Sequence, residues 1–291
     1  MVRRIEVRVP VRVDLAGCWT NFQPYASDFG GEVVNFAIDR YIKCFMEVDE
    51  GGEKRIEYSS DVPTGSGLGT SGAMNVELIA TITEDEKSPE DITKLSYKFE
   101  ELLKNSEERQ NQWDSVKGGF NHLLFLGDEV EEMPFEPMKS SKNWLRKYFI
   151  IAYSGNIHKS RDIHKKVWMD YKNQNKNVLE GLHCIRVAAR LMANGLQQDR
   201  REMVVKSLKD VVKGVDLINS EIHDPFREVI EPLIENKHAV AWKALGAGCG
   251  GSVGILCSPS GRKTVIESIE EAGWENIEWD YDEQGIKIEE R

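Results

Sequence analysis

A glycine-rich segment, residues 63–72, contains the residue types that bind phosphate. It reads Pro-Thr-Gly-Ser-Gly-Leu-Gly-Thr-Ser-Gly, so Gly65, Gly67 and Gly69 occupy alternate positions. Glycine lets the backbone turn tightly and present its N–H groups to an anion. The residues that follow have a helical composition, and a helix adds its positive N-terminal end to such a site. The spacing therefore predicts a phosphate-sized loop in front of a helix.

Two other glycine-rich phosphate sites fit this segment less well. The spacing Gly67-x-Gly69-x-x-Gly72 satisfies the dinucleotide fingerprint, but that site also needs an acidic residue ending a second parallel strand about 20 positions later. We predict a helix in that region, so a nicotinamide-dependent oxidoreductase is the most distant alternative. No lysine follows the glycines, which excludes a Walker loop.

Two further segments complete a pattern with this loop. Residues 10–21 read Pro-Val-Arg-Val-Asp-Leu-Ala-Gly-Cys-Trp-Thr-Asn, and residues 246–256 read Gly-Ala-Gly-Cys-Gly-Gly-Ser-Val-Gly-Ile-Leu. In order, spacing and flanking strands, the three segments resemble the three motifs of the GHMP kinases, the family of galactokinase, homoserine kinase, mevalonate kinase and phosphomevalonate kinase. The first resembles the version found in fucokinases and heptose-phosphate kinases. The resemblance spans nearly the whole chain.

The resemblance implies a two-domain α+β fold, with ATP as phosphoryl donor, Mg²⁺, and a small molecule held between the domains. The first domain, 1–148, would be ribosomal-protein-S5-domain-2-like and contain the phosphate loop. The second, 149–291, would be ferredoxin-like and contain the glycine-rich motif 246–251. The acceptor would be a hydroxyl of a sugar or sugar phosphate, with the anomeric hydroxyl as a candidate.

The resemblance also assigns residues to the parts of this reaction. Arg12 would lie near the γ-phosphate, where a cation stabilises developing negative charge, although a strand arginine is more often a surface residue. The hydroxyl of Ser71 and the carboxylate of Glu100 or Glu101 would hold the metal. The residues near the nucleotide would be Asn35, Gly65, Ser66, Gly67, Gly69, Thr70 and Ser71. The residues near the substrate would be Asp14, Gly17, Trp19, Thr20, Asn21, Gly248 and Gly250, with core packing as the alternative for Trp19.

One segment departs from the sugar kinases at the residue that takes the proton. Those relatives carry Gln-Asp-Gln where this chain has Gln-Asn-Gln at 110–112, and an amide cannot accept a proton. Asp114 lies three residues after Asn111, on the same face of a helix, and is a candidate substitute. Alternatively, the chain works as homoserine kinase relatives do, by positioning and γ-phosphate assistance.

A pseudokinase that binds nucleotide or sugar and has a regulatory role is the competing interpretation. It is favoured by Asn111, by Asn21 where relatives usually have Asp, and by the short interval between residues 48 and 63.

A predicted basic helix is equally open to two interpretations, a contact with a phosphorylated sugar or a solvated face. Its residues are His158, Lys159, Arg161, His164, Lys165 and Lys166.

Apolar periodicity predicts the elements that position these segments. Aliphatic residues at every second position predict a strand over 4–14, and residues 33–48 and 55–59, separated by Gly51-Gly52, predict a hairpin. We expect a second helix over 89–104, a strand over 147–153 and mostly helix up to about residue 245. A strand over 252–257, a helix over 262–272 and a final strand follow. This irregular order favours α+β over a doubly wound sheet.

Composition sets the broad class of protein. Of 291 residues, 40% are hydrophobic and 30% charged, and the formal charge of -11 opposes attraction to nucleic acid or anionic lipid. The five scattered cysteines form no metal-binding spacing and fit a reducing cytoplasm. Neither a signal peptide nor a membrane-spanning run is predicted. We expect no nucleic-acid or membrane partner, and a homodimer remains open.

Overall fold

The computed structural model describes residues 3–83, 91–92, 94–96, 98, 116–127, 129–155 and 160–290. The chain forms two compact units. The first contains Met1–Val13, Phe36–Phe120 and Trp279–Arg291, and the second contains Asp14–Asn35 and Asn121–Glu278. Each unit is therefore assembled from separate parts of the sequence, because two long strands, β1 (Arg3–Ala16) and β2 (Gly31–Val48), pass from one unit into the other.

This division differs from the predicted one. The predicted boundary after residue 148 falls inside the second unit, where α5 (Lys139–Tyr148) ends and β6 (Phe149–Tyr153) begins. The domains 1–148 and 149–291 therefore stay a prediction. A single cut along the sequence cannot reproduce units that share two continuous strands.

A six-stranded sheet has the order β10-β1-β2-β4-β5, and β3 also pairs with β2. Its further strands are β3 (Lys54–Ser60), β4 (Phe120–Leu126), β5 (Glu129–Glu132) and β10 (Lys287–Glu290). The predicted alternation along β1 is confirmed, because its aliphatic side chains are all at most 3% exposed. These side chains are Ile5, Val7, Val9, Val11 and Val13.

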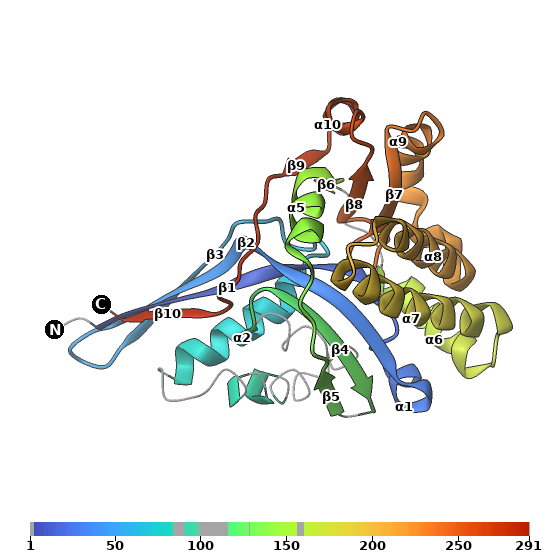
Figure 1. Cartoon of the computed structure of the whole chain (residues 1–291). Helices are drawn as coiled ribbons and strands as arrows, with labels where there is room; N and C mark the ends of the chain where they lie inside the picture. Colours follow the sequence, from blue (N-terminus) through green and yellow to red (C-terminus); the bar gives the residue numbers. More distant parts are fainter. Residues whose placement is uncertain are drawn as a thin grey trace. The chain divides into compact units, whose positions relative to one another are not determined.

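Within the first unit, β2 and β3 form the predicted hairpin. They pair in antiparallel register from Ile42 opposite Ser60 to Val48 opposite Lys54, around the glycines at 51 and 52. Strand β10 pairs with β1 next to it, so the two ends of the described chain lie side by side (Figure 1). Helix α2 (Thr70–Thr83) directly follows the predicted phosphate loop.

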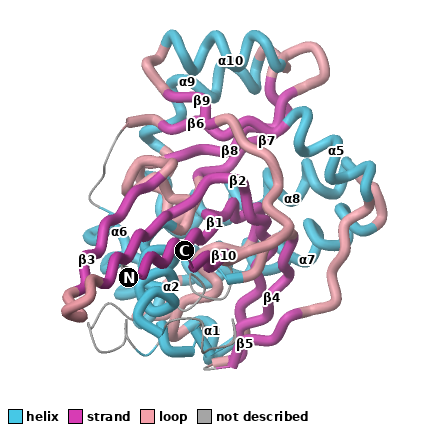
Figure 2. The backbone as a smooth tube through the Cα atoms, turned by 90° about the vertical axis from the view of Figure 1, so that its left-hand side faces the viewer, coloured by secondary structure: helices cyan, strands magenta, loops and turns pink. Residues whose placement is uncertain are grey.

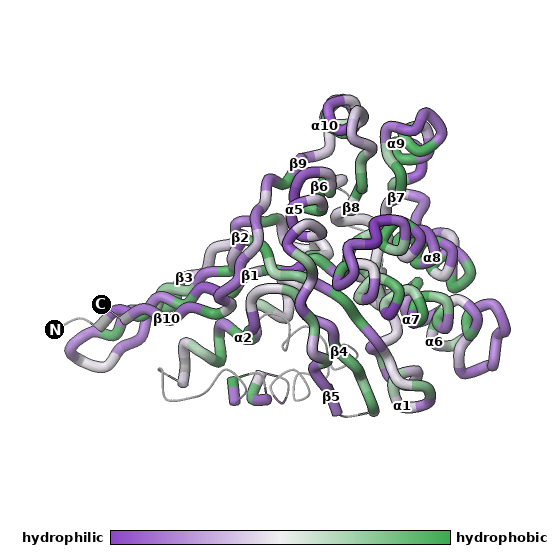
Figure 3. The backbone as a smooth tube through the Cα atoms, viewed as in Figure 1, coloured by the Kyte–Doolittle hydropathy of each residue, from purple (hydrophilic) through white to green (hydrophobic). Residues whose placement is uncertain are grey.

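The second unit contains an antiparallel four-stranded sheet in the order β7-β8-β6-β9, with β7 (Ala239–Ala244), β8 (Ser252–Cys257) and β9 (Glu275–Ile277). Helices α9 (Asp224–Glu235) and α10 (Arg262–Glu271) pack on it and share its core (Figure 2). Every residue of β8 is buried, and the strand is correspondingly apolar in Figure 3.

The remaining helices of this unit are α1 (Tyr25–Phe29), α6 (Ser160–Lys172), α7 (Lys176–Gln197) and α8 (Arg201–Asn219), followed by a 3₁₀ turn, Ser220–Ile222. Helix α7 begins after Asn175, whose side chain accepts hydrogen bonds from two backbone N–H groups. Helices α7 and α8 approach closely because glycines face each other. A Cβ on Gly181 would lie 2.5 Å from the carbonyl oxygen of Gly214.

The interspersed strands and helices are of the predicted α+β class. The region up to about residue 245 is mostly helical, as predicted, but it ends in strand β7, which was not predicted. This short strand is buried at five of its six residues, so it has no clear period to separate it from a helix. Strand β4 was not predicted either. Among the described residues, no helix is long and apolar enough to cross a membrane.

Candidate functional site

The phosphate loop has the backbone that its glycine spacing predicts. Gly65, Gly67 and Gly69 have φ angles of 76°, 76° and 74°, in the left-handed region that favours glycine. A backbone hydrogen bond attaches the loop to β1, because the N–H of Arg12 donates to the carbonyl of Leu68 at 3.0 Å. Helix α2 then begins at Thr70, so its N-terminal end follows the loop without a gap. Such a loop can present several N–H groups to one anion.

Arg12 lies directly against this loop. A Cβ on Gly69 would be 2.0 Å from Nη1 of Arg12, so the guanidinium occupies the space that a side chain at position 69 would fill. Arg12 is only 4% exposed, unlike a surface strand arginine. The structure therefore brings together the predicted cation and the predicted phosphate loop within the first unit.

The polar side chains of the loop differ in their exposure to solvent. The hydroxyl of Ser66 is fully buried and has no hydrogen-bond partner in the protein. Thr70 is 8% exposed, whereas Ser71, the predicted metal ligand, is solvent-exposed at the first turn of α2. A Cβ on Gly65 would meet no atom within 4 Å. Open space and a buried orphan hydroxyl fit a site built to receive the phosphates of a nucleotide.

Glu77 is a buried acid that sequence reasoning missed. It lies two turns into α2, is 0% exposed, and neither carboxyl oxygen has a hydrogen-bond partner. Burial raises the pKa of Glu77 to about 8, so the carboxyl is mostly protonated at neutral pH. When ionised, this carboxyl also helps to raise the pKa values of Cys44 and Tyr58 of the neighbouring hairpin, after burial as the main cause. An acid among apolar helix residues was the only signal in the sequence.

In the second unit, the predicted substrate loop Gly17–Asn21 is fixed by its own backbone. Gly17 has a φ of 98° and Trp19 a φ of 86°, which is rare for a residue other than glycine. The hydroxyl of Thr20 donates to the carbonyl of Gly17 at 2.8 Å and accepts from the N–H of Glu32 at 3.0 Å. Thr20 thus holds the loop in shape, and Asn21 is left with a buried side-chain oxygen that has no partner.

Trp19 is packed rather than open to solvent. It is 1% exposed and its ring stacks on His164 at 4.3 Å, in a cluster with Phe22 and Trp168. This is the core packing that the sequence left as the alternative. The indole Nε1 nevertheless has no hydrogen-bond partner. Asp14, at the start of the loop, is 2% exposed, and its carbonyl accepts a hydrogen bond from Nζ of Lys243 at 2.5 Å.

The glycine-rich loop 246–251 also has left-handed backbone, at Gly248 (φ 77°), at Gly250 (φ 129°) and even at Cys249 (φ 64°). Backbone groups of this loop contact other parts of the protein. The N–H of Cys249 donates to the carbonyl of Ile222 at 3.0 Å, and a Cβ on Gly248 would lie 2.3 Å from Cγ2 of Ile222. Burial raises the pKa of the Cys249 thiol to about 11, so it is no nucleophile at neutral pH.

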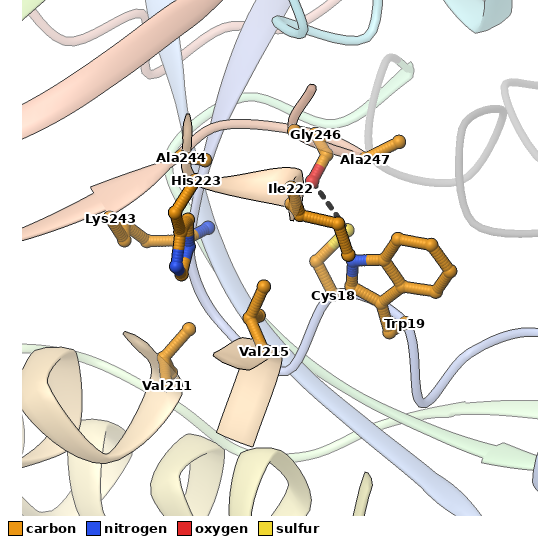
Figure 4. Close-up of a pocket in the computed structure, with 11 residues that line it drawn as sticks. Cys18, Trp19, Val211, Val215, Ile222, His223, Lys243, Ala244, Gly246 and Ala247 are labelled. Atoms are coloured by element: carbon orange, nitrogen blue, oxygen red, sulfur yellow. Dashed lines mark hydrogen bonds between the residues drawn. The ribbon is translucent and has the colours of Figure 1, made fainter. Parts of the chain in front are cut away.

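A small cavity of about 10 Å³ lies between the substrate loop and this glycine loop (Figure 4). Cys18 lines it and donates from Sγ to the carbonyl of Gly246 at 3.2 Å. Lys243 and His223 supply its charged and polar walls, and Val211 and Val215 its apolar ones. The volume suffices for one water molecule. The two loops are thus joined by direct contact rather than separated by a substrate-sized space.

Comparisons with known proteins extend over the whole chain. The chain is 24% identical to D-glycero-alpha-D-manno-heptose 7-phosphate kinase of Campylobacter jejuni, with 98% of this chain and 99% of that protein covered. It is also 24% identical to the mevalonate kinase of Pyrococcus abyssi, over 91% of this chain and 78% of that protein. Over nearly its whole length, the chain is therefore similar to members of the GHMP kinase superfamily. No protein-family model matches it.

A solved structure confirms the fold of this chain. A D-glycero-D-manno-heptose 1-phosphate kinase from Bacteroides thetaiotaomicron superposes with a TM-score of 0.79 at 17% identity, with 98% of each chain covered. The predicted α+β fold of GHMP kinases is therefore confirmed over nearly the whole chain.

Several predicted site residues lie outside the described residues or outside the first unit. The general-base candidates Asn111 and Asp114, the metal candidates Glu100 and Glu101, and most of the helix predicted over 89–104 are outside the described residues, as are His158, Lys159 and the side chain of Arg161. Asn35 belongs to the second unit, where its Oδ1 accepts from Asn121 at 3.2 Å and its Nδ2 has no partner. Lys165 and Lys166 are exposed on α6, and Lys166 pairs with Glu221 at 3.4 Å.

Proposed function

We propose that this GHMP kinase transfers the γ-phosphoryl group of ATP to a hydroxyl of a sugar or sugar phosphate. The observation that carries the proposal is the phosphate loop, with left-handed backbone at three alternate glycines and Arg12 packed against Gly69. Phosphoryl transfer requires positioning and neutralisation of charge more than covalent chemistry, and this loop offers both.

Each described residue has a limited part in this reaction. The N–H groups of the loop and the N-terminal end of α2 would bind the phosphates, and Ser66 would donate its buried hydroxyl to one of their oxygens. The guanidinium of Arg12 would stabilise negative charge on the group in transfer.

Mg²⁺ would neutralise further charge, held by the phosphates and by the hydroxyl of Ser71. The described residues contain no cluster of three or more histidine, cysteine, aspartate or glutamate side chains that could hold a metal. This donor set fits Mg²⁺, which is commonly bound through substrate phosphates and few protein groups.

The sugar class of acceptor is supported by the relatives. A heptose 7-phosphate kinase aligns over 98% of this chain, and the mevalonate kinase aligns over 91%. Buried orphan groups in the second unit, the oxygen of Asn21 and Nε1 of Trp19, are a hydrogen-bond acceptor and a donor that hydroxyl groups could satisfy. The anomeric hydroxyl is one candidate position, and the prediction that Asp114 or the γ-phosphate takes the proton remains a prediction.

The experiment is a measurement of ADP formation with Mg²⁺ across hexoses, pentoses, heptose phosphates, homoserine and mevalonate. The loop variant is Gly67→Asp, which places a negative charge in the phosphate loop. Its matched control is Gly52→Asp, because Gly52 has a similar φ of 81°, in the β2–β3 hairpin, with no atom within 4 Å of a Cβ. We expect turnover with one sugar class, lost in Gly67→Asp and kept in Gly52→Asp.

The second candidate function is a nucleotide-binding pseudokinase, favoured by asparagine at position 111. It predicts ATP binding that Gly67→Asp abolishes, with no ADP formed from any acceptor. Turnover of mevalonate alone would instead reject the sugar class while keeping the kinase.

A further inference from the structure

The substrate loop rests on the first residues of β2. A Cβ on Gly17 would lie 1.9 Å from the carbonyl oxygen of Glu32, and a Cβ on Gly31 would lie 2.3 Å from the carbonyl oxygen of Thr20. The N–H of Glu32 donates to the hydroxyl of Thr20 at 3.0 Å. The backbone at residues 31 and 32 therefore acts as the support against which Gly17–Asn21 is shaped.

The turn that leads into this support contains two glycines. Gly30, with a φ of 77°, and Gly31 form the turn from α1 into β2, and glycine leaves the backbone there conformationally free. A specific position for Glu32 must therefore come from its side chain and from the strand that follows it.

The side chain of Glu32 is held from two other elements. It is 1% exposed, and its carboxylate accepts hydrogen bonds from Nε2 of His122 on β4 at 2.8 Å and from Nε and Nη2 of Arg190 on α7 at 3.1 and 2.9 Å. Burial by itself would raise the pKa of Glu32, but the hydrogen bonds from His122 and Arg190 lower it below its usual value. Glu32 is thus a carboxylate at neutral pH, and the two-point bond to Arg190 fixes its orientation.

We propose that Glu32, clamped by Arg190 and His122, is a positioning residue that holds the loop Gly17–Asn21 in the shape that binds the phosphoryl acceptor. That the loop binds a phosphoryl acceptor rests on the proposed function. That Glu32 controls the shape of the loop rests on the contacts of Glu32 alone. Glu32 does not touch the substrate in this account, and its effect passes through its backbone to Thr20 and Gly17. The clamp belongs to the second unit and has no part in binding ATP.

Arg190 offers a clean way to open the clamp. Its side chain is 61% exposed, so the variant Arg190→Ala leaves a gap beside the buried carboxylate that solvent reaches. Free guanidinium ion has the planar fork of the missing group and can refill this gap at millimolar concentration. The matched control is Arg262→Ala, because Arg262, in the same unit, also donates from Nε, to the carbonyl of Lys147 at 3.1 Å, away from the loop.

The first measurement is amide hydrogen exchange, read by mass spectrometry over peptides that cover residues 14–34. In Arg190→Ala we expect exchange of the amides in the substrate loop and at Glu32 to become about tenfold faster or more. About 10 mM guanidinium chloride should restore protection, whereas the same concentration of sodium chloride should not. Arg262→Ala should leave these peptides unchanged. Unchanged exchange in Arg190→Ala, or faster exchange that guanidinium does not reverse, overturns the proposal.

The second measurement is steady-state kinetics with ATP and heptose 7-phosphate as the acceptor probe. We expect Arg190→Ala to raise KM for the acceptor about tenfold, to leave KM for ATP within about twofold, and to recover with guanidinium. An equal rise of both KM values would indicate general destabilisation and overturn the selective role. If the wild type turns over no acceptor, the proposed function fails, and the exchange measurement still decides the coupling, because it needs no substrate.

Discussion

The two glycine-rich loops of this protein use the same residue for different purposes. In the phosphate loop, a Cβ at Gly65 would meet nothing, and the neighbouring Ser66 has a buried hydroxyl without a partner. In the loop 246–251, a Cβ at Gly248 would collide with Ile222, and the backbone N–H groups of Gly248 and Cys249 both have partners within the protein. The first loop therefore has open space and an unused hydroxyl, whereas the second is closely packed, although Ser252 beside the second loop also has an orphan hydroxyl.

The difference shows that glycine spacing alone does not identify a binding site. Unused hydrogen-bonding groups and open space distinguish the first loop, whereas close contacts explain the glycines of the second. The predictions below test this contrast through ligand binding on one side and stability on the other.

The largest effect is expected from Arg12→Ala. Removing the guanidinium that packs on Gly69 should lower kcat by about 10²–10³-fold, because the positive charge that would stabilise the group in transfer is lost. Steady-state ADP formation measures it. Arg4→Ala is the control on the same strand, since Arg4 is exposed and forms an ion pair with Glu47. Retention of more than a tenth of kcat in Arg12→Ala would contradict the role of Arg12.

Gly248→Ala and Gly65→Ala test the contrast directly. The first forces a side chain against Ile222 in left-handed backbone, and should lower the free energy of unfolding by about 2–4 kcal/mol. The second carries only the backbone cost of about 1–2 kcal/mol, yet should weaken ATP binding. Denaturant titration and calorimetric ATP binding measure the two effects. Equal destabilisation with unchanged ATP affinity would remove the distinction.

Glu77→Gln tests the buried acid behind the phosphate loop. The pKa of Glu77 is raised to about 8 in the folded protein, so the folded state retains a proton that the unfolded state loses from about pH 4.5 upward. Stability should therefore fall as pH rises towards about 8, by up to about 1.4 kcal/mol per pH unit from this group. In Glu77→Gln this fall should be absent.

The comparison is made by denaturant titration from pH 5 to 8, with Glu57→Gln as the control because Glu57 is exposed on β3. The stability advantage of Glu77→Gln over the wild type should grow with pH, and that of Glu57→Gln should not. Parallel profiles for all three proteins would show that Glu77 is ionised or solvated in the folded state.

The smallest effect is expected from Ser66→Ala. The hydroxyl has no partner in the protein, so its removal should leave the free energy of unfolding unchanged within about 0.5 kcal/mol. ATP affinity should fall by about tenfold, because one hydrogen bond to a charged phosphate is lost. Calorimetric titration with ATP measures this. A destabilised protein with normal ATP affinity would place Ser66 in packing rather than in binding.

Patterns with a short period were enough to predict much of the fold. The alternation along β1, the β2–β3 hairpin and the helix after the phosphate loop follow from local sequence, because side-chain direction repeats within a few residues. Strand β7 was not predicted, because a short strand that is buried at five of its six residues has no clear period. The division into units was also not predictable, because it depends on strands that continue from one unit into the other.

The sequence by itself determined the chemistry that the chain can offer: a glycine loop for phosphate, an arginine near it, and a motif order shared with the GHMP kinases. Only the tertiary structure decided which residues are free to act. In the folded protein Arg12 packs against Gly69, and the hydroxyl of Thr20 donates a hydrogen bond to the carbonyl of Gly17. The side chains of Ser66 and Glu77 have no hydrogen-bond partner, and Glu32 binds Arg190, which lies 158 positions away in the sequence. The physical reason is that hydrogen-bond satisfaction and burial depend on neighbours distant in the chain, which no local pattern encodes.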